Sequence, residues 1–291
     1  MKVAVVTGAT GFLGPFVVRA LRERHPDLQL RCVVRKSSNT DPVRLPGVTL
    51  ATADLRDAAA LAEAFQGADT LINVASLGFD WTANVVATAQ RANIRRAVFI
   101  STTAILTSLP VKSKPVRVRG EELVRDSGTA WTILRPTMIY GTPKDRNVAR
   151  LIRFVSWSPV IPVLAPQALQ QPIHVEDVAW AVAAALGNDT TVGRAYNISG
   201  AAPLAMGSLV REVAAALGRR RLFVPVPLPA MLSVLAVWAA VMRPPISLEQ
   251  ARRIGENKSF DYADAARDFQ FAPRDFRAGV RTAVALFRSN R

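Results

Sequence analysis

Short apolar runs alternate with amphipathic stretches through the first half of the chain. The runs rich in Val, Ile and Leu predict strands, and apolar residues spaced three or four positions apart predict helices. The expected strands are residues 2–8, 28–35, 69–76, 96–102 and 131–136, and the expected helices are residues 15–25, 59–67, 83–93 and 118–128. Strands and helices that alternate in this way form right-handed βαβ units, so the pattern predicts an α/β fold with a doubly wound parallel sheet.

The regular alternation ends near residue 140. Further helices are expected at residues 172–187 and 207–220, but no repeat and no Gly/Ser-rich linker marks a boundary. We therefore expect residues 1–140 to form the core, and residues 141–291 to form mainly a smaller C-terminal lobe packed on it. Residues 171–200 are expected to return to the core.

Composition narrows the class of protein. The chain is 50% hydrophobic and 20% charged, which is typical of a folded protein. The single cysteine, Cys32, cannot form an internal disulfide, and this favours a reducing compartment. Only five apolar residues precede Gly8, too few for the apolar region of a secretory signal. Together these features predict a cytoplasmic protein.

The chain is strongly basic. Its 37 Lys and Arg residues outnumber 22 Asp and Glu residues and give a net charge of +15. Such an excess attracts an anionic membrane surface, phosphorylated ligands or nucleic acid, although a solvated surface that binds nothing has the same signature. No nucleic-acid motif accompanies the charge, so nucleic acid is not expected as a partner. No Cys/His cluster has metal-ligand spacing, so no metal is predicted, and the sequence leaves the oligomeric state open.

The segment "TGATGFLG" places three glycines between the first expected strand and the first expected helix. Glycine permits the tight turn at Gly8, a close backbone approach to a pyrophosphate near Gly11, and close helix–strand packing at Gly14. The helix N-terminus then offers N–H groups to phosphate oxygens. The pattern predicts a dinucleotide site, and the turn residues expected to hold it are Gly8, Thr10, Gly11, Phe12 and Leu13.

The residues at the end of the second expected strand indicate whether the bound dinucleotide is NAD or NADP. A carboxylate at this position binds the ribose 2′-hydroxyl of NAD, but the sequence here is "VVRKSS". Arg35 and Lys36 supply two cations, and Ser37 adds a hydroxyl, for a 2′-phosphate. The alternative is a basic pair on the solvated surface. We predict NADP(H) as the cofactor.

Several motifs carry a resemblance to a known family. The Gly-x-x-Gly-x-x-Gly spacing is followed by "ADLRD", "INVAS", "FISTTA", "ILRPTMIYG" and "QPIHVEDVA" across most of the chain. This set resembles the extended and atypical short-chain dehydrogenase/reductase superfamily. That superfamily has a Rossmann fold and includes epimerase/dehydratase-like proteins and the Rossmann accessory subunit of respiratory complex I.

The resemblance also implies roles for individual residues. Asp54 and Leu55 would border the adenine, and Ala75 would lie on the ribose side. Pro136 would begin the loop against the nicotinamide, and the Thr103 hydroxyl would face the substrate carbonyl. Residues 141–291 would then form mainly the substrate lobe.

The catalytic Tyr-x-x-x-Lys pair of that superfamily is absent. Its two positions fall on Ser113 and Arg117. A serine hydroxyl can donate a hydrogen bond to a carbonyl or relay a proton from water. Arginine can hold the nicotinamide ribose and stabilise an alkoxide, but it stays charged and transfers no proton. Reduction needs no strong base, whereas epimerisation does, so the altered pair favours a reductase.

A second Tyr-x-x-x-Lys spacing, Tyr140–Lys144, is not a substitute. Gly141 and Pro143 predict a loop there, so the two side chains cannot share a helix face. Tyr140 either lines the substrate pocket or is a half-buried loop aromatic. The lysines that flank Ser113 either supply its proton or belong to an exposed basic loop.

Three functions remain open at this point. The first is an NADPH-dependent carbonyl reductase that acts on a keto-lipid of the ceramide type or on a lipid-linked substrate. The second is a sugar-nucleotide epimerase, dehydratase or reductase. The third is a non-catalytic NADPH-binding scaffold, as the resemblance to the complex I subunit allows.

One apolar segment bears on the substrate. Residues 222–242 carry no charge and follow the run Arg219–Arg221. Prolines restrict a helix to about residues 230–242, which is too short to span a bilayer. The segment is either a core helix of the second lobe or an apolar lip that dips into the cytoplasmic face of an anionic membrane.

Overall fold

The computed structural model describes residues 2–233 and 248–289. The chain forms two compact units. The first unit contains residues 1–136, 175–198 and 262–272, and the second contains residues 137–174, 199–261 and 273–291. Each unit is therefore assembled from three separate stretches of sequence.

The first unit is built on a seven-stranded sheet with the order β11-β6-β5-β4-β1-β2-β3, in which every pairing is parallel. This confirms the predicted fold class. The order reverses at β1, which lies between β2 and β4, and ligands of such sheets bind where the order reverses, beyond the carboxyl ends of the strands. The strands are β1 (Val3–Thr7), β2 (Gln29–Val34), β3 (Val48–Thr52), β4 (Thr70–Asn73), β5 (Arg96–Ile100), β6 (Ala130–Pro136) and β11 (Arg194–Ile198).

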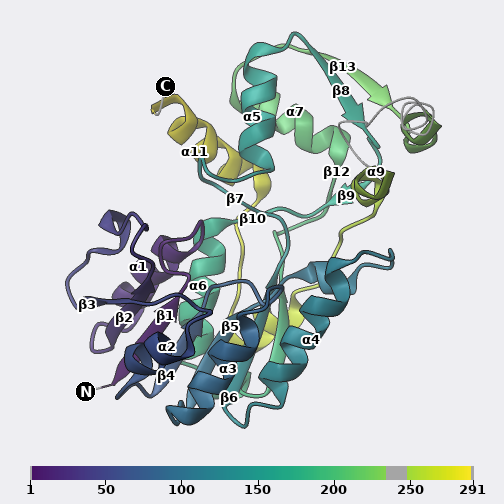
Figure 1. Cartoon of the computed structure of the whole chain (residues 1–291). Coiled ribbons are helices and arrows are strands. Elements are labelled where there is room, and N and C mark those ends of the chain that lie inside the picture. The colour runs from purple at the N-terminus through teal and green to yellow at the C-terminus, as the bar shows by residue number, and fades with distance from the viewer. Residues whose placement is uncertain (1, 234–247, 290–291) are drawn as a thin grey trace. The chain divides into compact units, whose positions relative to one another are not determined.

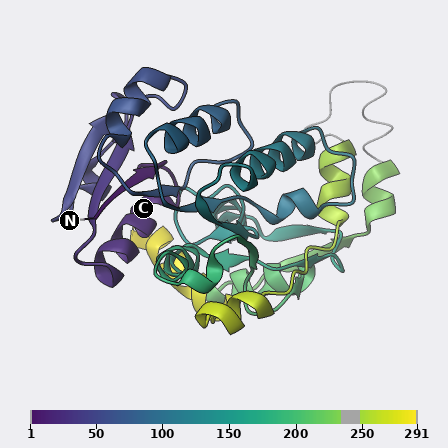
Figure 2. The same ribbon diagram turned by 90° about the horizontal axis from the view of Figure 1, so that it is seen from below.

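Helices cover both faces of this sheet. Figures 1 and 2 show α2, α3 and α4 on one face, and Figure 1 shows α1 and α6 on the other. Leu61 and Phe65 of α2, Val85 of α3 and Val124 of α4 pack on the sheet in one hydrophobic core. The helices are α1 (Gly14–Arg24), α2 (Ala58–Phe65), α3 (Thr82–Arg91), α4 (Ser113–Arg125), α6 (Val175–Leu186) and α10 (Ala263–Phe269), with short 3₁₀ turns η1 (Asp41–Val43), η2 (Thr103–Leu106) and η3 (Asp189–Thr191).

Within residues 1–136, two elements differ most from the sequence prediction. β3 was not expected, because its residues are only partly buried or exposed and form no apolar run. α4 begins at Ser113, five residues before the expected helix. Pro115 lies in the first turn of α4, where a missing N–H costs no intrahelical hydrogen bond, so it does not prevent the earlier start.

The second unit is mainly helical. Its core joins α5, α7 and α11, with Ile152, Val213 and Val280 among the buried residues. Its described residues also form three small two-stranded sheets: β7 with β10, β9 with β12, and β8 with β13. The elements are β7 (Ile139–Tyr140), α5 (Val148–Trp157), β8 (Val160–Leu164), β9 (Leu169–Gln170), β10 (Ile173–His174), β12 (Leu204–Ala205), α7 (Met206–Ala216), β13 (Leu222–Val226), α9 (Leu248–Gly255) and α11 (Phe276–Ser289).

The apolar segment 222–242 begins as a strand. Leu222–Val226 forms β13, and the chain is helical from residue 228 to residue 233. The rest of the expected helix at 230–242 lies outside the described residues. Within the ranges that the structure describes, none of the helices combines the length and apolar character needed to cross a bilayer.

Candidate functional site

The glycine turn joins β1 to α1 at the point where the strand order reverses. Gly8 has φ +71°, and a Cβ atom placed on it would come within 2.7 Å of the Ala75 backbone nitrogen. The Gly11 N–H donates to the Gly8 carbonyl at 3.0 Å and closes the turn. A Cβ on Gly14 would overlap the Ala9 carbonyl oxygen. The backbone is therefore compact where the sequence predicted a pyrophosphate cradle, with Thr10 and Phe12 partly exposed and the Leu13 side chain buried.

Buried polar side chains hold the two central strand ends together. The Thr7 hydroxyl donates to the Asn73 side-chain oxygen at 2.6 Å, and the Asn73 side-chain nitrogen donates to the Ala75 carbonyl at 2.8 Å. These bonds fix the ends of β1 and β4 to each other. Gly8 and Ala75, both predicted cofactor residues, therefore lie in contact.

Two exposed cations follow β2. Arg35, Lys36 and Ser37 are all exposed, in a turn closed by the Ser38 N–H donating to the Arg35 carbonyl at 2.9 Å. In the described part of the chain, no carboxylate forms an ion pair with Arg35 or Lys36. Both cations are thus available to an anionic group of a ligand.

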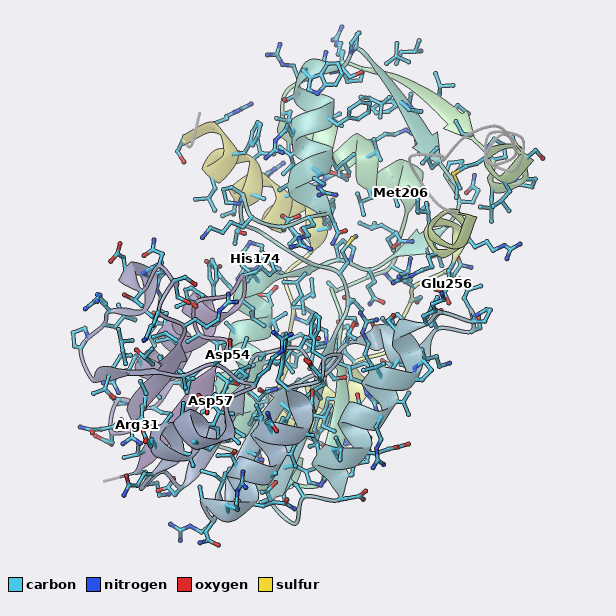
Figure 3. All side chains as sticks on the ribbon, in the orientation of Figure 1. Arg31, Asp54, Asp57, His174, Met206 and Glu256 are labelled. Carbon is cyan, nitrogen blue, oxygen red and sulfur yellow. The ribbon has the colours of Figure 1, made fainter. Side chains whose placement is uncertain are left out.

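Two aspartates of the loop after β3 accept hydrogen bonds from nearby backbone N–H groups. Asp54 is exposed and accepts the Arg56 N–H at 2.9 Å, and Figure 3 shows it near Asp57. Asp57 caps α2 by accepting the Ala59 and Ala60 N–H groups, both at 3.0 Å. Leu55 is half-buried against the core. Because all the strands are parallel, the predicted adenine-side residues Asp54 and Leu55 follow the carboxyl end of β3 and lie at the same end of the sheet as the glycine turn.

Helix α4 carries the residues that stand in place of the Tyr–Lys pair. Ser113 is its first residue and Arg117 follows one turn later, and both are partly exposed. A Cβ atom on Gly78 would come within 3.0 Å of the Arg117 side chain, so Arg117 lies against the loop after β4. The Lys114 ammonium donates to the Thr107 carbonyl at 2.6 Å, whereas Lys112 is exposed.

The hydroxyl predicted to face a substrate is buried. Thr103 is only 6% exposed, and its hydroxyl donates to the Pro136 carbonyl at 3.4 Å. Thr102 is partly exposed, and its hydroxyl accepts the Ala104 N–H at 3.2 Å. Thr103 begins the 3₁₀ turn η2, and Thr102 precedes it with extended backbone as its N-cap. Of the two neighbouring hydroxyls, that of Thr102 is therefore the more exposed, whereas that of Thr103 is engaged with a backbone carbonyl.

Tyr140 lies in the core of the second unit. It belongs to strand β7 and not to a loop, and it is 1% exposed. Its ring packs against Phe276 at 5.2 Å and against His174 at 5.3 Å between centroids. A Cβ on Gly279 would overlap its hydroxyl. The sequence interpretation of Tyr140 as a half-buried loop aromatic is therefore wrong, and this geometry gives no support to a pocket-lining role.

A buried ion pair anchors α4 to the sheet, and the sequence analysis missed it. Glu121 accepts from Arg135 of β6 through both carboxylate oxygens, and its side chain is 4% exposed. Arg125 adds a longer contact at 3.3 Å and lies over the Trp131 ring. Burial by itself would raise the pKa of Glu121, but the hydrogen bonds and charge of Arg135 outweigh it and hold the pKa below its usual range. Glu121 follows Arg117 by one turn, so the pair fixes the helix that carries the candidate catalytic residues.

One open cavity of the first unit lies away from this chemistry. It has a volume of about 640 Å³ and is lined by Lys2, Thr70 and Arg96, which lie at the amino ends of β1, β4 and β5. The glycine turn and the predicted cofactor residues lie at the carboxyl ends of the same strands. Ligand binding at a reversal of strand order takes place at the carboxyl ends, so we do not assign this cavity to the cofactor.

Comparison with known proteins agrees with the geometry of the first unit. A family model described as NAD(P)H-binding matches residues 8–189. The matched stretch begins at the glycine turn and contains α4. It covers more than half of the chain.

Curated relatives include enzymes and a subunit of a larger assembly. The ceramide reductase of Caulobacter vibrioides is 35% identical over 192 residues, which cover 61% of this chain and 58% of the relative. The mitochondrial NADH dehydrogenase (ubiquinone) 1 alpha subcomplex subunit 9 of Mus musculus is 29% identical over 249 residues, which cover 78% of this chain and 64% of the relative. The matches thus span less than two thirds of the length of either relative.

A solved structure matches over nearly the whole chain. A nucleoside-diphosphate-sugar epimerase from Pseudomonas aeruginosa superposes with a TM-score of 0.82 and 19% identity, covering 99% of this chain and 98% of that chain. At this identity the likeness concerns the fold. It shows that this chain and that epimerase have the same fold.

Proposed function

Because the chain belongs to the NAD(P)H-binding family, and to the extended short-chain dehydrogenase/reductase type that its motifs resemble, we propose that it is an NADPH-dependent carbonyl reductase with a ketone-bearing lipid as substrate. The observation that carries the proposal is the pair Ser113–Arg117 on α4, at the position of the Tyr–Lys pair. The pair offers a hydroxyl and a fixed positive charge, but no base.

The glycine turn and the loop after β2 fit NADPH. The compact backbone at Gly8 and Gly11 leaves room for a pyrophosphate at the N-terminus of α1. Arg35 and Lys36 would bind the 2′-phosphate, because they are exposed and carry no carboxylate partner within the described residues. A guanidinium binds phosphate oxygens bidentately, so Arg35 would make the stronger contact.

The site residues fit reduction. When bound, NADPH supplies a hydride to the carbonyl carbon, which becomes the carbinol carbon of an alcohol. Ser113 and Thr102 would donate hydrogen bonds to the carbonyl oxygen, and Arg117 would stabilise the negative charge that develops on it. The proton that completes the alcohol would reach the oxygen through Ser113, from water or from the exposed Lys112. An epimerase must first remove a proton from its substrate, and this pair offers no group suited to that step.

The substrate class rests on the relatives. The likeness to a ceramide reductase supports a ketone on an acylated amine, although the matched region covers 58% of that relative. The second unit contains an open, mostly apolar cavity of about 530 Å³, lined by Ala165, Pro166, Ala168, Pro225 and Leu228 among others. Such a cavity suits part of an apolar molecule better than a sugar nucleotide.

The test is an assay of NADPH oxidation with the full chain. We expect absorbance at 340 nm to fall when an N-acylated amino ketone is supplied in detergent micelles, with the matching alcohol formed in equal amount. Binding of NADPH without oxidation by any ketone would overturn the proposal in favour of a non-catalytic role. Conversion of a sugar nucleotide without net NADPH consumption would overturn it in favour of an epimerase.

Charge reversal at Arg35 should change the cofactor preference. We expect Arg35→Asp to weaken NADPH binding by roughly ten- to a hundredfold, since it removes a charge-assisted contact and adds a repulsive one. NADH binding should change little. Calorimetric titration of both cofactors measures this, with Arg19→Asp on the exposed side of α1 as the charge-matched control. Equal affinity of the unaltered protein for the two cofactors would contradict the assignment.

Replacement of the candidate site hydroxyls should affect the catalytic rate and not the affinity for the cofactor. We expect Ser113→Ala and Thr102→Val each to lower kcat by roughly ten- to a hundredfold with cofactor affinity retained. Arg117→Ala should lower kcat and weaken NADPH binding, because Arg117 would also contact the ribose. Thr103→Val is the control, and it should affect stability more than kcat because its hydroxyl is buried. Full activity of Ser113→Ala would assign the proton route to another group.

A further inference from the structure

Strands β8 and β13 of the second unit expose an apolar face. They pair in parallel, with Leu222 opposite Val160 and Val224 opposite Pro162, so these four side chains lie on one side of the pair. Leu222 is 63% exposed, Val160 43% and Val224 41%. Trp157, at the end of α5 three residues before Val160, is 66% exposed. We refer to Trp157, Val160, Pro162, Leu222 and Val224 as the β8/β13 face.

The opposite side of the same two strands is buried. Ile161, Val163 and Phe223 point into the core formed with α5, α7 and α11. Alternation along the strands therefore supplies apolar residues to both sides, whereas a strand pair with one solvated side carries polar residues there. Contiguous apolar surface of this kind usually marks an interaction site.

The two segments that contain these strands have arginines and no acidic residues. Residues 146–170 and 213–233 contain no Asp or Glu, but they contain Arg146, Arg150, Arg153, Arg219, Arg220 and Arg221. Arg219 and Arg220 are exposed immediately before β13. Arg221 donates to the Val155 and Ser156 carbonyls, both at 2.9 Å, and so ties the start of β13 to the end of α5. The arginine run is thereby joined at Arg221 to the last turn of α5, which ends at Trp157.

We propose that the β8/β13 face docks on an anionic lipid bilayer. Exposed aliphatic side chains and a tryptophan enter the boundary between head groups and acyl chains, where an indole is favoured. Arg219 and Arg220 bind lipid phosphates beside them, and the absence of acidic residues from both flanking segments removes repulsion. In this proposal the strand β13, and not a helix, supplies the apolar lip that was one of the two alternatives for residues 222–242. The proposal does not depend on the reaction that the enzyme catalyses.

The electrostatic part of the contact is tested by co-sedimentation with vesicles of phosphatidylcholine and phosphatidylglycerol at a 3:1 ratio. We expect binding at low ionic strength that weakens in 0.5 M salt, since screening shortens the range of the attraction to about 3–5 Å. The variant Arg219→Ser/Arg220→Ser should bind about thirtyfold more weakly. Arg19→Ser/Arg95→Ser removes the same charge from exposed positions of the first unit, and it should bind as the unaltered protein does.

The apolar part is tested separately. We expect Leu222→Ser/Val224→Ser to weaken binding at least tenfold, whereas Val192→Ser/Leu286→Ser, at positions 38% and 39% exposed elsewhere, should not. Tryptophan fluorescence should shift to shorter wavelength on vesicle addition, and the shift should be lost in Trp157→Phe. Circular dichroism confirms that each variant is folded.

Three results would overturn the proposal. The first is no binding to these vesicles at low salt. The second is an equal loss of binding in Arg219→Ser/Arg220→Ser and in Arg19→Ser/Arg95→Ser, which would show attraction by net charge alone. The third is displacement from the vesicles by a short DNA duplex at equal phosphate concentration, combined with full binding by Leu222→Ser/Val224→Ser, which would show a general polyanion surface.

Discussion

Glu121→Gln is expected to lower the free energy of unfolding by about 3–5 kcal/mol, because it leaves the largely buried Arg135 guanidinium without its counter-charge. Urea denaturation at pH 7 measures the change. The matched control is Glu122→Gln, the same substitution one residue along α4. Glu122 is 48% exposed and pairs with Arg119 at 3.3 Å, so its loss should cost less than about 1 kcal/mol.

The effect of Glu121→Gln should depend on pH. The pKa of Glu121 is lower in the folded protein than in the unfolded chain, so its carboxylate adds stability above the unfolded pKa of about 4.3. That contribution is lost as the pH falls through the lower folded-state pKa. The difference in stability between the unaltered protein and the variant should therefore be constant above about pH 5 and should shrink in more acidic solution. Equal costs for Glu121→Gln and Glu122→Gln would contradict the anchoring role.

Gly8→Ala is expected to destabilise the protein by about 2–5 kcal/mol and to abolish measurable NADPH binding. Two costs add at this position. A non-glycine residue at φ +71° is strained, and the new Cβ would lie 2.7 Å from the Ala75 backbone nitrogen, which cannot move without separating β1 from β4. Calorimetric titration and urea denaturation measure the two losses.

Gly67→Ala isolates the first of these costs. Gly67 also has φ +71°, but no atom lies within 4 Å of the position that a Cβ would take there. Its replacement should cost only the conformational term, about 1–2 kcal/mol, with normal NADPH affinity. If both variants lost the same stability and both bound NADPH, the close approach of Gly8 to Ala75 would have no role in the site.

The predicted elements that the structure confirms are those with strong local patterns. β1, β2 and β4 are buried apolar runs, and the glycine turn has a fixed spacing. β3 has no such run, because it lies at the sheet edge and its side chains are partly exposed. Its β-branched residues, in "VTLAT", were the available signal.

The errors in the site have a common physical origin. A motif does not predict the exposure of each of its residues, and the adjacent hydroxyls of Thr102 and Thr103 differ in exposure because the 3₁₀ turn η2 begins at Thr103. Glu121 and Arg135 form an ion pair because α4 packs on β6. The local sequence around either residue does not predict this long-range contact. The turn that Gly141 and Pro143 predict was taken to include Tyr140, whereas Tyr140 is the last residue of strand β7.

Because residues 262–272 belong to the first unit, that unit cannot complete its folding until late in translation. Its Asp268 accepts a hydrogen bond from the Tyr196 hydroxyl of β11 at 2.7 Å, and its Phe269 packs on the same ring at 5.2 Å. These residues leave the ribosome more than sixty positions after β11, and the chain of the second unit emerges between them. While residues 199–261 are translated, the Tyr196 side chain of β11 therefore lacks its contacts with Asp268 and Phe269. The first unit can complete its folding only after residue 272 has left the ribosome.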